Sequence, residues 1–160
     1  NGTNPRGTHT HRAHTLWHCR IGFVSEKLTM MENLFIEQTS YTPQVYFDEE
    51  GNKLCLTGRS FPEDATSFYT PVLAWFETNK NNLQPNFSVE VLLDYYNTAS
   101  SKYLVKLFRM TEELHEKKGL TVSIVWKYAT NDEDMKEAGS EYKQFIDIPF
   151  EMVEVEKKVL

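Results

Sequence analysis

The feature that most constrains the fold is a change of hydrophobic period between residues 95 and 102. Before it, apolar residues recur at every second position, as in a strand with one buried face; these are Phe87, Val89, Val91, Leu93 and Tyr95. After it, apolar residues recur at helical spacing among charged residues; these are Leu104, Leu107, Phe108 and Leu114. The pattern predicts a long strand that leads directly into a long amphipathic helix.

The turn between these segments is rich in hydroxyl groups and reads Tyr95-Tyr96-Asn97-Thr98-Ala99-Ser100-Ser101-Lys102. A helix start has N–H groups without partners and the positive end of the helix dipole, so it suits a phosphate. Thr98 has a hydroxyl that could carry one, Ser100 and Ser101 supply donors, and Lys102 follows one turn later. Alternatively, Asn97 or Thr98 is simply the N-cap, which is the commoner role of such residues. The turn alone leaves both interpretations open.

The composition indicates one ordinary domain. The 160 residues are 40% hydrophobic and 13% aromatic, enough for a sizeable core. No apolar run approaches the roughly 20 residues that cross a bilayer, so we expect a cytoplasmic protein without direct membrane insertion. The two cysteines, Cys19 and Cys55, give neither a disulfide framework nor a metal-binding spacing.

The charge is divided unevenly along the chain. Residues 1–30 hold four Lys/Arg and one acid, a net charge of +3, which leaves −9 for residues 31–160 of a chain with net charge −6. An acidic body is a poor surface for a nucleic acid backbone. We therefore expect protein partners and no nucleic acid.

The first 30 residues differ from the rest because they show no sustained period. They hold four of the five histidines, at positions 9, 11, 14 and 18, next to Cys19, and such a tract could bind a transition metal. A disordered extension, derived from a vector or from translation upstream of the true start, explains them without a metal. We expect a domain over 31–156 and a frayed end over 157–160.

Periodicity and turn residues predict the remaining elements. A hairpin is expected from 34–36, 45–47 and the alternating residues after the turn at 48–52, with Gly58 closing the last arm. A helix follows from Asp64, either kinked at Pro71 or beginning again there. After the central strand and helix, which ends at Gly119, we expect a strand over 120–128, a helix from 131 to 145 and a final strand over 150–155.

This order, β-β-β-α-β-α-β-α-β, predicts the fold class: α/β, a single-domain mixed β-sheet with about three helices packed against it. Strands joined through helices lie parallel, and functional sites gather where such strands end. The turn at 96–102 is at one of those ends.

No catalytic constellation is recognisable. The chain lacks a phosphate-binding glycine pattern and a nucleophile elbow, and His115 is the only histidine after residue 30. We expect no enzyme, no cofactor and no metal site. Two other classes remain open: a small enzyme or ligand-binding module that uses the turn as a pocket, and a structural assembly protein in which Thr98 is an inert cap.

From residue 31 to about 156 the sequence resembles the SiaC family of bacterial regulatory phosphoproteins. The order and spacing of several motifs carry the resemblance. They are Thr42-Pro43 with Phe47-Asp48, Gly58-Arg59-Ser60-Phe61-Pro62-Glu63-Asp64, Phe68-Tyr69 with Pro71-Val72-Leu73-Ala74-Trp75, Tyr96-Asn97-Thr98-Ala99-Ser100-Ser101-Lys102, and Trp126-Lys127-Tyr128 followed by Asp132-Glu133-Asp134-Met135 and Glu137-Ala138-Gly139.

The resemblance implies a STAS-like fold and a partner-switching function. A cognate kinase phosphorylates the strand-helix turn, a PP2C-type phosphatase removes the phosphate, and the unmodified protein binds a target. The target is a diguanylate cyclase, or another signalling protein, in cyclic-di-GMP and biofilm control. The implied phosphoacceptor is Thr98, with Ser100 and Ser101 as alternatives. The residues expected to support the phosphate or bind the partner are Tyr96, Asn97, Ser100, Ser101, Lys102, Pro62, Glu63 and Asp64.

Overall fold

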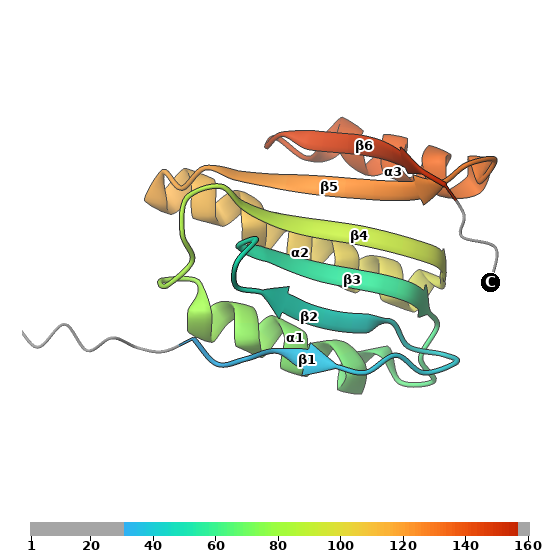
Figure 1. The fold of residues 1–160 in the computed structure, drawn as a ribbon, viewed down its shortest axis with the longest axis horizontal. Helices are drawn as coiled ribbons and strands as arrows, with labels where there is room; N and C mark the ends of the chain where they lie inside the picture. The colour runs from blue at the N-terminus through green and yellow to red at the C-terminus, as the bar shows by residue number, and fades with distance from the viewer. Residues whose placement is uncertain (1–30, 157–160) are drawn as a thin grey trace, which may run out of the picture.

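The computed structural model describes residues 31–156, so the expectations for 1–30 and 157–160 lie outside the described residues. Figure 1 shows a single curved sheet with helices behind it. The strands are β1 Phe35–Ile36, β2 Gln44–Asp48, β3 Lys53–Ser60, β4 Phe87–Tyr96, β5 Val122–Ala129 and β6 Phe150–Val155. The helices are α1 Ala65–Asn79, α2 Thr98–Lys118 and α3 Glu133–Phe145.

The sheet is mixed, as the element order predicted. Its six strands lie in the order β1-β2-β3-β4-β5-β6. Strands β1, β2 and β3 pair antiparallel, and β3, β4, β5 and β6 pair parallel through helical crossovers. All three helices cover the same face (Figure 1). The prediction of a single α/β domain with about three helices is therefore confirmed.

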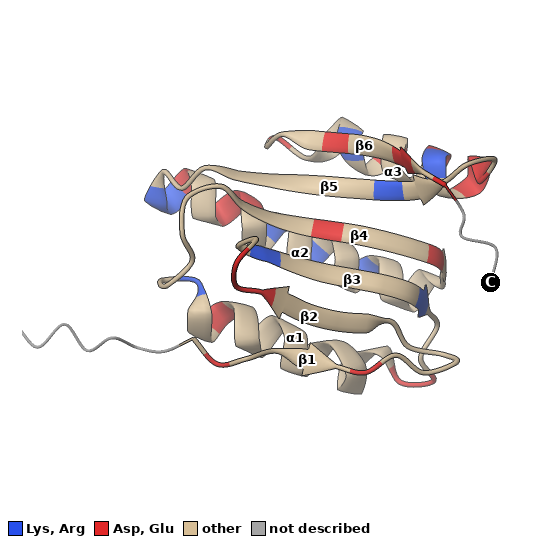
Figure 2. Cartoon of the chain, viewed as in Figure 1, with Lys and Arg blue, Asp and Glu red and all other residues tan. Residues whose placement is uncertain are grey.

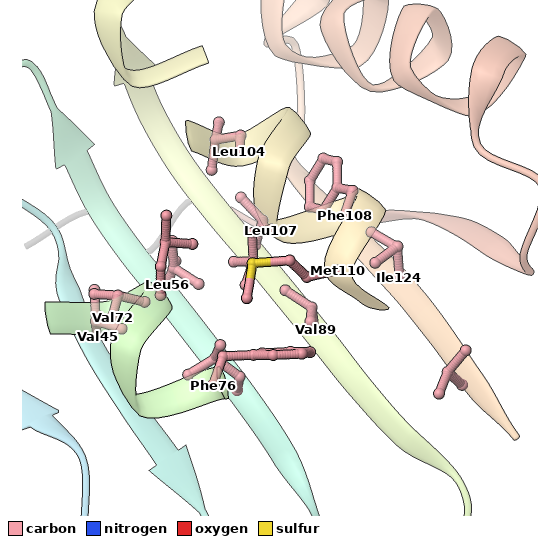
Figure 3. Close-up of a cluster of buried hydrophobic side chains, with 14 of the residues drawn as sticks. Val45, Leu56, Val72, Phe76, Val89, Leu104, Leu107, Phe108, Met110 and Ile124 are labelled. Carbon is pink, nitrogen blue, oxygen red and sulfur yellow. The ribbon is translucent and has the colours of Figure 1, made fainter. Parts of the chain in front are cut away.

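The core lies between the sheet and the helices. From Phe87 to Leu93 alternate residues of β4 are buried and the residues between them are half-buried, which reproduces the period of 2 seen in the sequence. Tyr95, which the pattern placed on the same face, is exposed, because the register with β3 shifts after Leu93. In Figure 3, Val89 of β4 and Ile124 of β5 point toward Leu107 and Phe108 of α2. Val72 and Phe76 of α1 fill the space beside Leu56 and are fully buried. The helical and strand periods in the sequence thus mark the two sides of one core.

The opposite face of the sheet carries no helix, and charged residues are scattered along its strands (Figure 2). The Lys53 ammonium lies 3.9 Å from a carboxylate oxygen of Asp48 and 3.5 Å from one of Glu90. The Lys127 ammonium lies 2.8 Å from the other Glu90 oxygen. This chain of ion pairs across β2 to β5 gives the open face a polar character, so solvent can cover it.

Two local expectations are corrected or resolved. Gly58 does not end its strand, because β3 continues to Ser60. Gly58 has φ +110°, and the register with β4 shifts between it and Arg59, so the glycine forms an irregularity inside the strand. Of the two alternatives for Pro71, the first holds in part: one helix begins after Asp64 and continues through the proline.

Candidate functional site

The hydroxyl-rich turn lies where β4 ends and α2 begins, at the carboxyl edge of the parallel strands. Asn97 is the N-cap: its side-chain oxygen accepts a hydrogen bond of 2.8 Å from the backbone N–H of Ser100. Thr98 is the first helical residue, and its side chain is exposed. Among the described residues, the Thr98 hydroxyl has no hydrogen-bond partner. Since Asn97 performs the capping, the hydroxyl of Thr98 is free for another role.

Ser100 faces inward, so it differs from the solvated donor that the sequence suggested. It is fully buried, and its hydroxyl donates to the backbone carbonyl of Ser60 at 3.0 Å. The Ser60 hydroxyl in turn donates to the Ser100 hydroxyl at 2.8 Å. That bond uses the only hydroxyl proton of Ser60, so the Tyr69 hydroxyl donates to Ser60 across 2.6 Å. Burial raises the pKa of Tyr69, which keeps it a donor.

These bonds fix the turn on the rest of the fold. The carbonyl of Ser60 also accepts from the backbone N–H of Asn97 at 2.9 Å, so one residue at the end of β3 holds both the cap and the first turn of α2. Tyr69 adds α1 to the network and stacks against Tyr103 of α2 at 5.0 Å. A buried network with every donor satisfied gives the turn a defined position.

The other predicted residues of the turn are more accessible. Ser101 is half-buried and donates to the carbonyl of Thr98 at 2.7 Å. Lys102 is exposed, and Tyr96 and Asn97 are half-buried. Of the three alternative acceptors, Thr98 alone combines an exposed side chain with a hydroxyl that no other described residue engages.

The residues predicted at 62–64 belong to the neighbouring junction between β3 and α1. Pro62 is buried, and Glu63 and Asp64 are exposed. Asp64 caps α1 by accepting from the backbone N–H of Ser67 at 3.1 Å and from its hydroxyl at 2.6 Å. These bonds lower the pKa of Asp64, so the cap is an anion at neutral pH. The carboxylate of Asp64 is therefore already engaged with α1.

A groove of about 500 Å³ opens beside Thr98, between α2 and α3. It brings together four predicted residues, Tyr96, Asn97, Thr98 and Ser101, whereas the junction at 62–64 does not line it. Its walls include two of the most exposed large apolar side chains in the described part of the chain: Tyr95, 47% exposed, and Phe145, 38% exposed.

The wall formed by α3 was not found from the sequence. Helix α3 packs very close to the sheet at Gly139, where an added Cβ would lie 2.4 Å from Cδ1 of Trp126. The indole N–H of Trp126 donates to the carbonyl of Met135 at 2.8 Å. Burial and the neighbouring Tyr96 hydroxyl raise the pKa of Tyr142, which therefore stays neutral in the groove floor. The only sequence signal was the pair of small residues at 138 and 139, which is too common to identify a groove.

Other kinds of site are not found within residues 31–156. No group of His, Cys, Asp and Glu side chains there is arranged to hold a metal ion. No helix of this part of the chain is long and apolar enough to pass through a bilayer. Cys55 is buried, and burial raises its pKa, so it is a core residue and not a reactive thiol.

Comparisons with known proteins show which family and which solved structures this chain is similar to. The sequence model described as SiaC family regulatory phosphoprotein matches residues 36–155. An uncharacterised protein of Pseudomonas aeruginosa (strain UCBPP-PA14) is 29% identical over 120 residues, which cover 75% of this chain and 94% of that protein. The crystal structure of the diguanylate cyclase SiaD in complex with its activator SiaC, also from P. aeruginosa, matches with a TM-score of 0.71 and 28% identity, over 76% of this chain and 99% of the matched one. Apo-SiaC from the same organism matches with a TM-score of 0.68 and 26% identity, over 77% and 99%.

Proposed function

This chain belongs to the SiaC family of regulatory phosphoproteins, and from that premise we propose that it is a protein-binding switch controlled by phosphorylation of Thr98. It is a regulator and not an enzyme. SiaC of P. aeruginosa is the activator of the diguanylate cyclase SiaD. The corresponding target of this protein is a diguanylate cyclase, which it binds when Thr98 is unmodified.

The observation that carries the assignment is that the exposed hydroxyl of Thr98, at the start of α2, is bound by no residue within 31–156. A kinase needs an acceptor that it can reach, and Thr98 is exposed while Ser100 is sealed beneath the turn. Thr98 is also one residue after the cap, so the cap hydrogen bond of Asn97 is not lost when Thr98 is modified. Phosphorylation can therefore change the surface without unfolding the helix start.

The surroundings of Thr98 can stabilise a phosphate. The first turn of α2 offers backbone N–H groups and the positive end of the helix dipole. Neither the cap nor the first turn contains an acid. Lys102 is exposed one turn further along α2, where its ammonium can approach the added charge.

The same phosphate weakens target binding at the groove. It adds about −1.5 to −2 charges and a tightly held hydration shell. Thr98 and Asp134 both line the groove. Thr98 is the first residue of α2, and Asp134 is the second residue of α3. A partner that covers this end would have to bury a dianion beside a carboxylate, which costs both desolvation and like-charge repulsion.

Two enzymes complete the switch. A cognate protein kinase transfers the γ-phosphoryl group of ATP to Oγ1 of Thr98, and a PP2C-type phosphatase hydrolyses the phosphoester back to the hydroxyl. We place the system in the cytoplasm, where ATP and a diguanylate cyclase domain are available. Tyr96, Asn97, Ser101 and Lys102 form the surface around the acceptor.

The first test is phosphate mapping by mass spectrometry after incubation with the cognate kinase and ATP. Wild-type protein should carry one phosphate on Thr98, Thr98→Ala should carry none, and the matched control Ser101→Ala should behave as wild type. Phosphate on Ser101 with none on Thr98 would refute the assignment of the acceptor.

The second test measures affinity for the cyclase by calorimetry. Thr98→Ala should bind constitutively, and Thr98→Asp should bind at least about tenfold more weakly, since a like-charge contact costs more than 1.4 kcal/mol. Equal binding of the cyclase by the two variants would refute the proposed switch.

A further inference from the structure

We propose that the groove between α2 and α3 binds an amphipathic helix of the partner that carries an apolar stripe and, opposite Glu141, a Lys or Arg. This inference rests on the proposed function, because it identifies what occupies the surface that Thr98 controls. It goes further by specifying the secondary structure and charge of the partner segment.

The shape of the groove fits a helix. Helices α2 and α3 both start at the edge where β4 and β5 end, and both contribute to its walls. On α2 the lining positions are 98, 101 and 105, and on α3 they include 134, 138, 141 and 145. These spacings of three and four residues form one stripe on each helix, and a third helix can pack its own ridge between two such stripes.

The surface of the groove is apolar where a partner stripe would lie. Val105 and Ala138 are half-buried in its walls, and Met135 is buried beneath them. Tyr95 and Phe145 expose large rings. Aromatic side chains of this kind, apolar with a polar atom or edge, are enriched at the energetic centres of interfaces.

The charge of the groove selects the flank of the partner helix. Its charged lining residues in the described part of the chain are Asp134 and Glu141, both exposed and both acidic. The nearest cation at the far end, Arg109, lies over the Phe145 ring at 5.6 Å, but its guanidinium is paired with Glu112 at 2.7 Å. Glu141 lies about two turns beyond Asp134, toward the C-terminal end of α3. A Lys or Arg of the bound helix opposite Glu141 would complement that carboxylate, whereas the end of the bound helix that faces Thr98 and Asp134 carries no cation with which a phosphate could pair.

A second groove, between α1 and α2, differs from the α2–α3 groove in the charge of its lining. It is of similar size, about 540 Å³, but its charged lining has both signs: Lys106 and Arg109 against Glu77 and Glu113. It also lacks Thr98. It therefore offers no single charge preference and no link to the switch, and it serves as an internal control.

The experiment uses two synthetic helical peptides of about 18 residues, or five turns. They share one leucine stripe and differ only in carrying Lys or Glu at the position that faces Glu141. Each is titrated into the ¹⁵N-labelled protein. The Lys peptide should shift amide signals along 98–105 and 134–145, and the Glu peptide should bind at least about tenfold more weakly. If neither peptide binds, or if both bind equally, the proposed occupant is wrong.

Three variants locate the binding site. Ala138→Arg should abolish binding of the Lys peptide, because it fills the groove, whereas the matched variant Ala74→Arg in the other groove should leave it unchanged. Glu141→Lys changes only an exposed side chain and should reverse the preference from the Lys to the Glu peptide. Unchanged peptide preference in Glu141→Lys would overturn the inference even if Ala138→Arg failed to fold.

The same variants separate this inference from the proposed function. If Thr98→Asp weakens cyclase binding but Ala138→Arg does not, the switch stands and the partner docks elsewhere. If Ala138→Arg blocks binding and Thr98→Asp has no effect, the groove is the docking site and the switch is wrong.

Discussion

Two strand-to-helix junctions lie at the same edge of the sheet and start their helices with different charges. After β3, helix α1 is capped by the carboxylate of Asp64. After β4, helix α2 is capped by the neutral amide of Asn97. The third helix, α3, has Asp132 as its cap and Glu133 and Asp134 in its first turn. In the described part of the chain, α2 is thus the helix whose start has no negative charge to balance its dipole.

The threonine hydroxyls in the first turns of α1 and α2 also differ, because one is hydrogen-bonded to another side chain and the other is not. In the first turn of α1, Thr66 accepts a hydrogen bond of 2.7 Å from the Tyr103 hydroxyl. In the first turn of α2, the Thr98 hydroxyl is bound by no other described residue. A phosphate at the start of α1 would be a second anion beside the Asp64 cap, whereas at the start of α2 it would be the first anion at that helix end. The comparison indicates why one threonine is structural and the other is suited to modification.

The largest effect should come from Ser60→Ala, because Ser60 joins the two junctions. The substitution removes the Ser60 hydroxyl to which the buried Tyr69 hydroxyl donates, which should lower the free energy of unfolding by about 1–3 kcal/mol. Chemical denaturation measures this loss. Ser140→Ala is the control, since Ser140 is exposed and bonds only within its own helix at 3.0 Å, so its change should stay within about 0.5 kcal/mol. Similar losses for both would mean that the buried network does not couple the junctions.

A smaller effect should follow from giving α2 the charged cap of α1. Asn97→Asp keeps the cap oxygen, so the unphosphorylated protein should be as stable as wild type or more stable by up to about 1 kcal/mol. Phosphothreonine introduced at position 98 by semisynthesis should stabilise the wild-type protein by a similar amount, but it should destabilise the Asn97→Asp protein, where it meets a like charge. Thermal unfolding of the four proteins checks this. An equal response to phosphate in both backgrounds would show that the neutral cap has no role.

Most of the fold could be predicted from the sequence because its periods are strong. The burial follows the alternation of β4 from Phe87 to Leu93 and the apolar helical spacing after Thr98. Tyr95 was predicted wrongly as a buried residue, because the register shift between β3 and β4 that ends the alternation is not visible in the sequence. Gly58 was predicted wrongly because a glycine inside a strand and a glycine that ends one look alike without the partner strand. Pro71 could not be resolved because a helix tolerates a proline when tertiary packing holds it together, as the buried Val72 and Phe76 do here.

The candidate site was less predictable, because its geometry depends on residues distant in sequence. The sequence placed three hydroxyls in one turn, but only Ser60, 40 residues earlier, shows that Ser100 is buried by a network. The groove needs α3, whose close approach depends on the pair Gly139 and Trp126. No local pattern records such a pair, so a single sequence cannot place the groove.

The smallest effect concerns stability in acid, where the contribution of the Asp64 cap should depend on pH and that of the Asn97 cap should not. The hydrogen bonds from Ser67 hold the pKa of Asp64 in the folded state below the usual 3.8. The ionised cap therefore stabilises the fold at neutral pH, and this contribution is lost as the pH falls through the lowered folded-state pKa. Asp64→Asn should flatten the decline of Tm between about pH 5 and pH 3, and only slightly, since Asp64 is exposed and screened.

The matched variant at the other junction should behave differently. Asn97 has no charge to lose, so Asn97→Ala should lower Tm by a similar amount at every pH, because the lost cap costs about 1 kcal/mol of unfolding free energy. The measurement is a series of thermal unfolding curves from pH 7 to pH 3 for the wild type and both variants. If Asp64→Asn runs parallel to wild type and Asn97→Ala does not, the charges assigned to the two helix starts are the wrong way round. In that case the start of α2 would not be the uncompensated end that a phosphate on Thr98 requires.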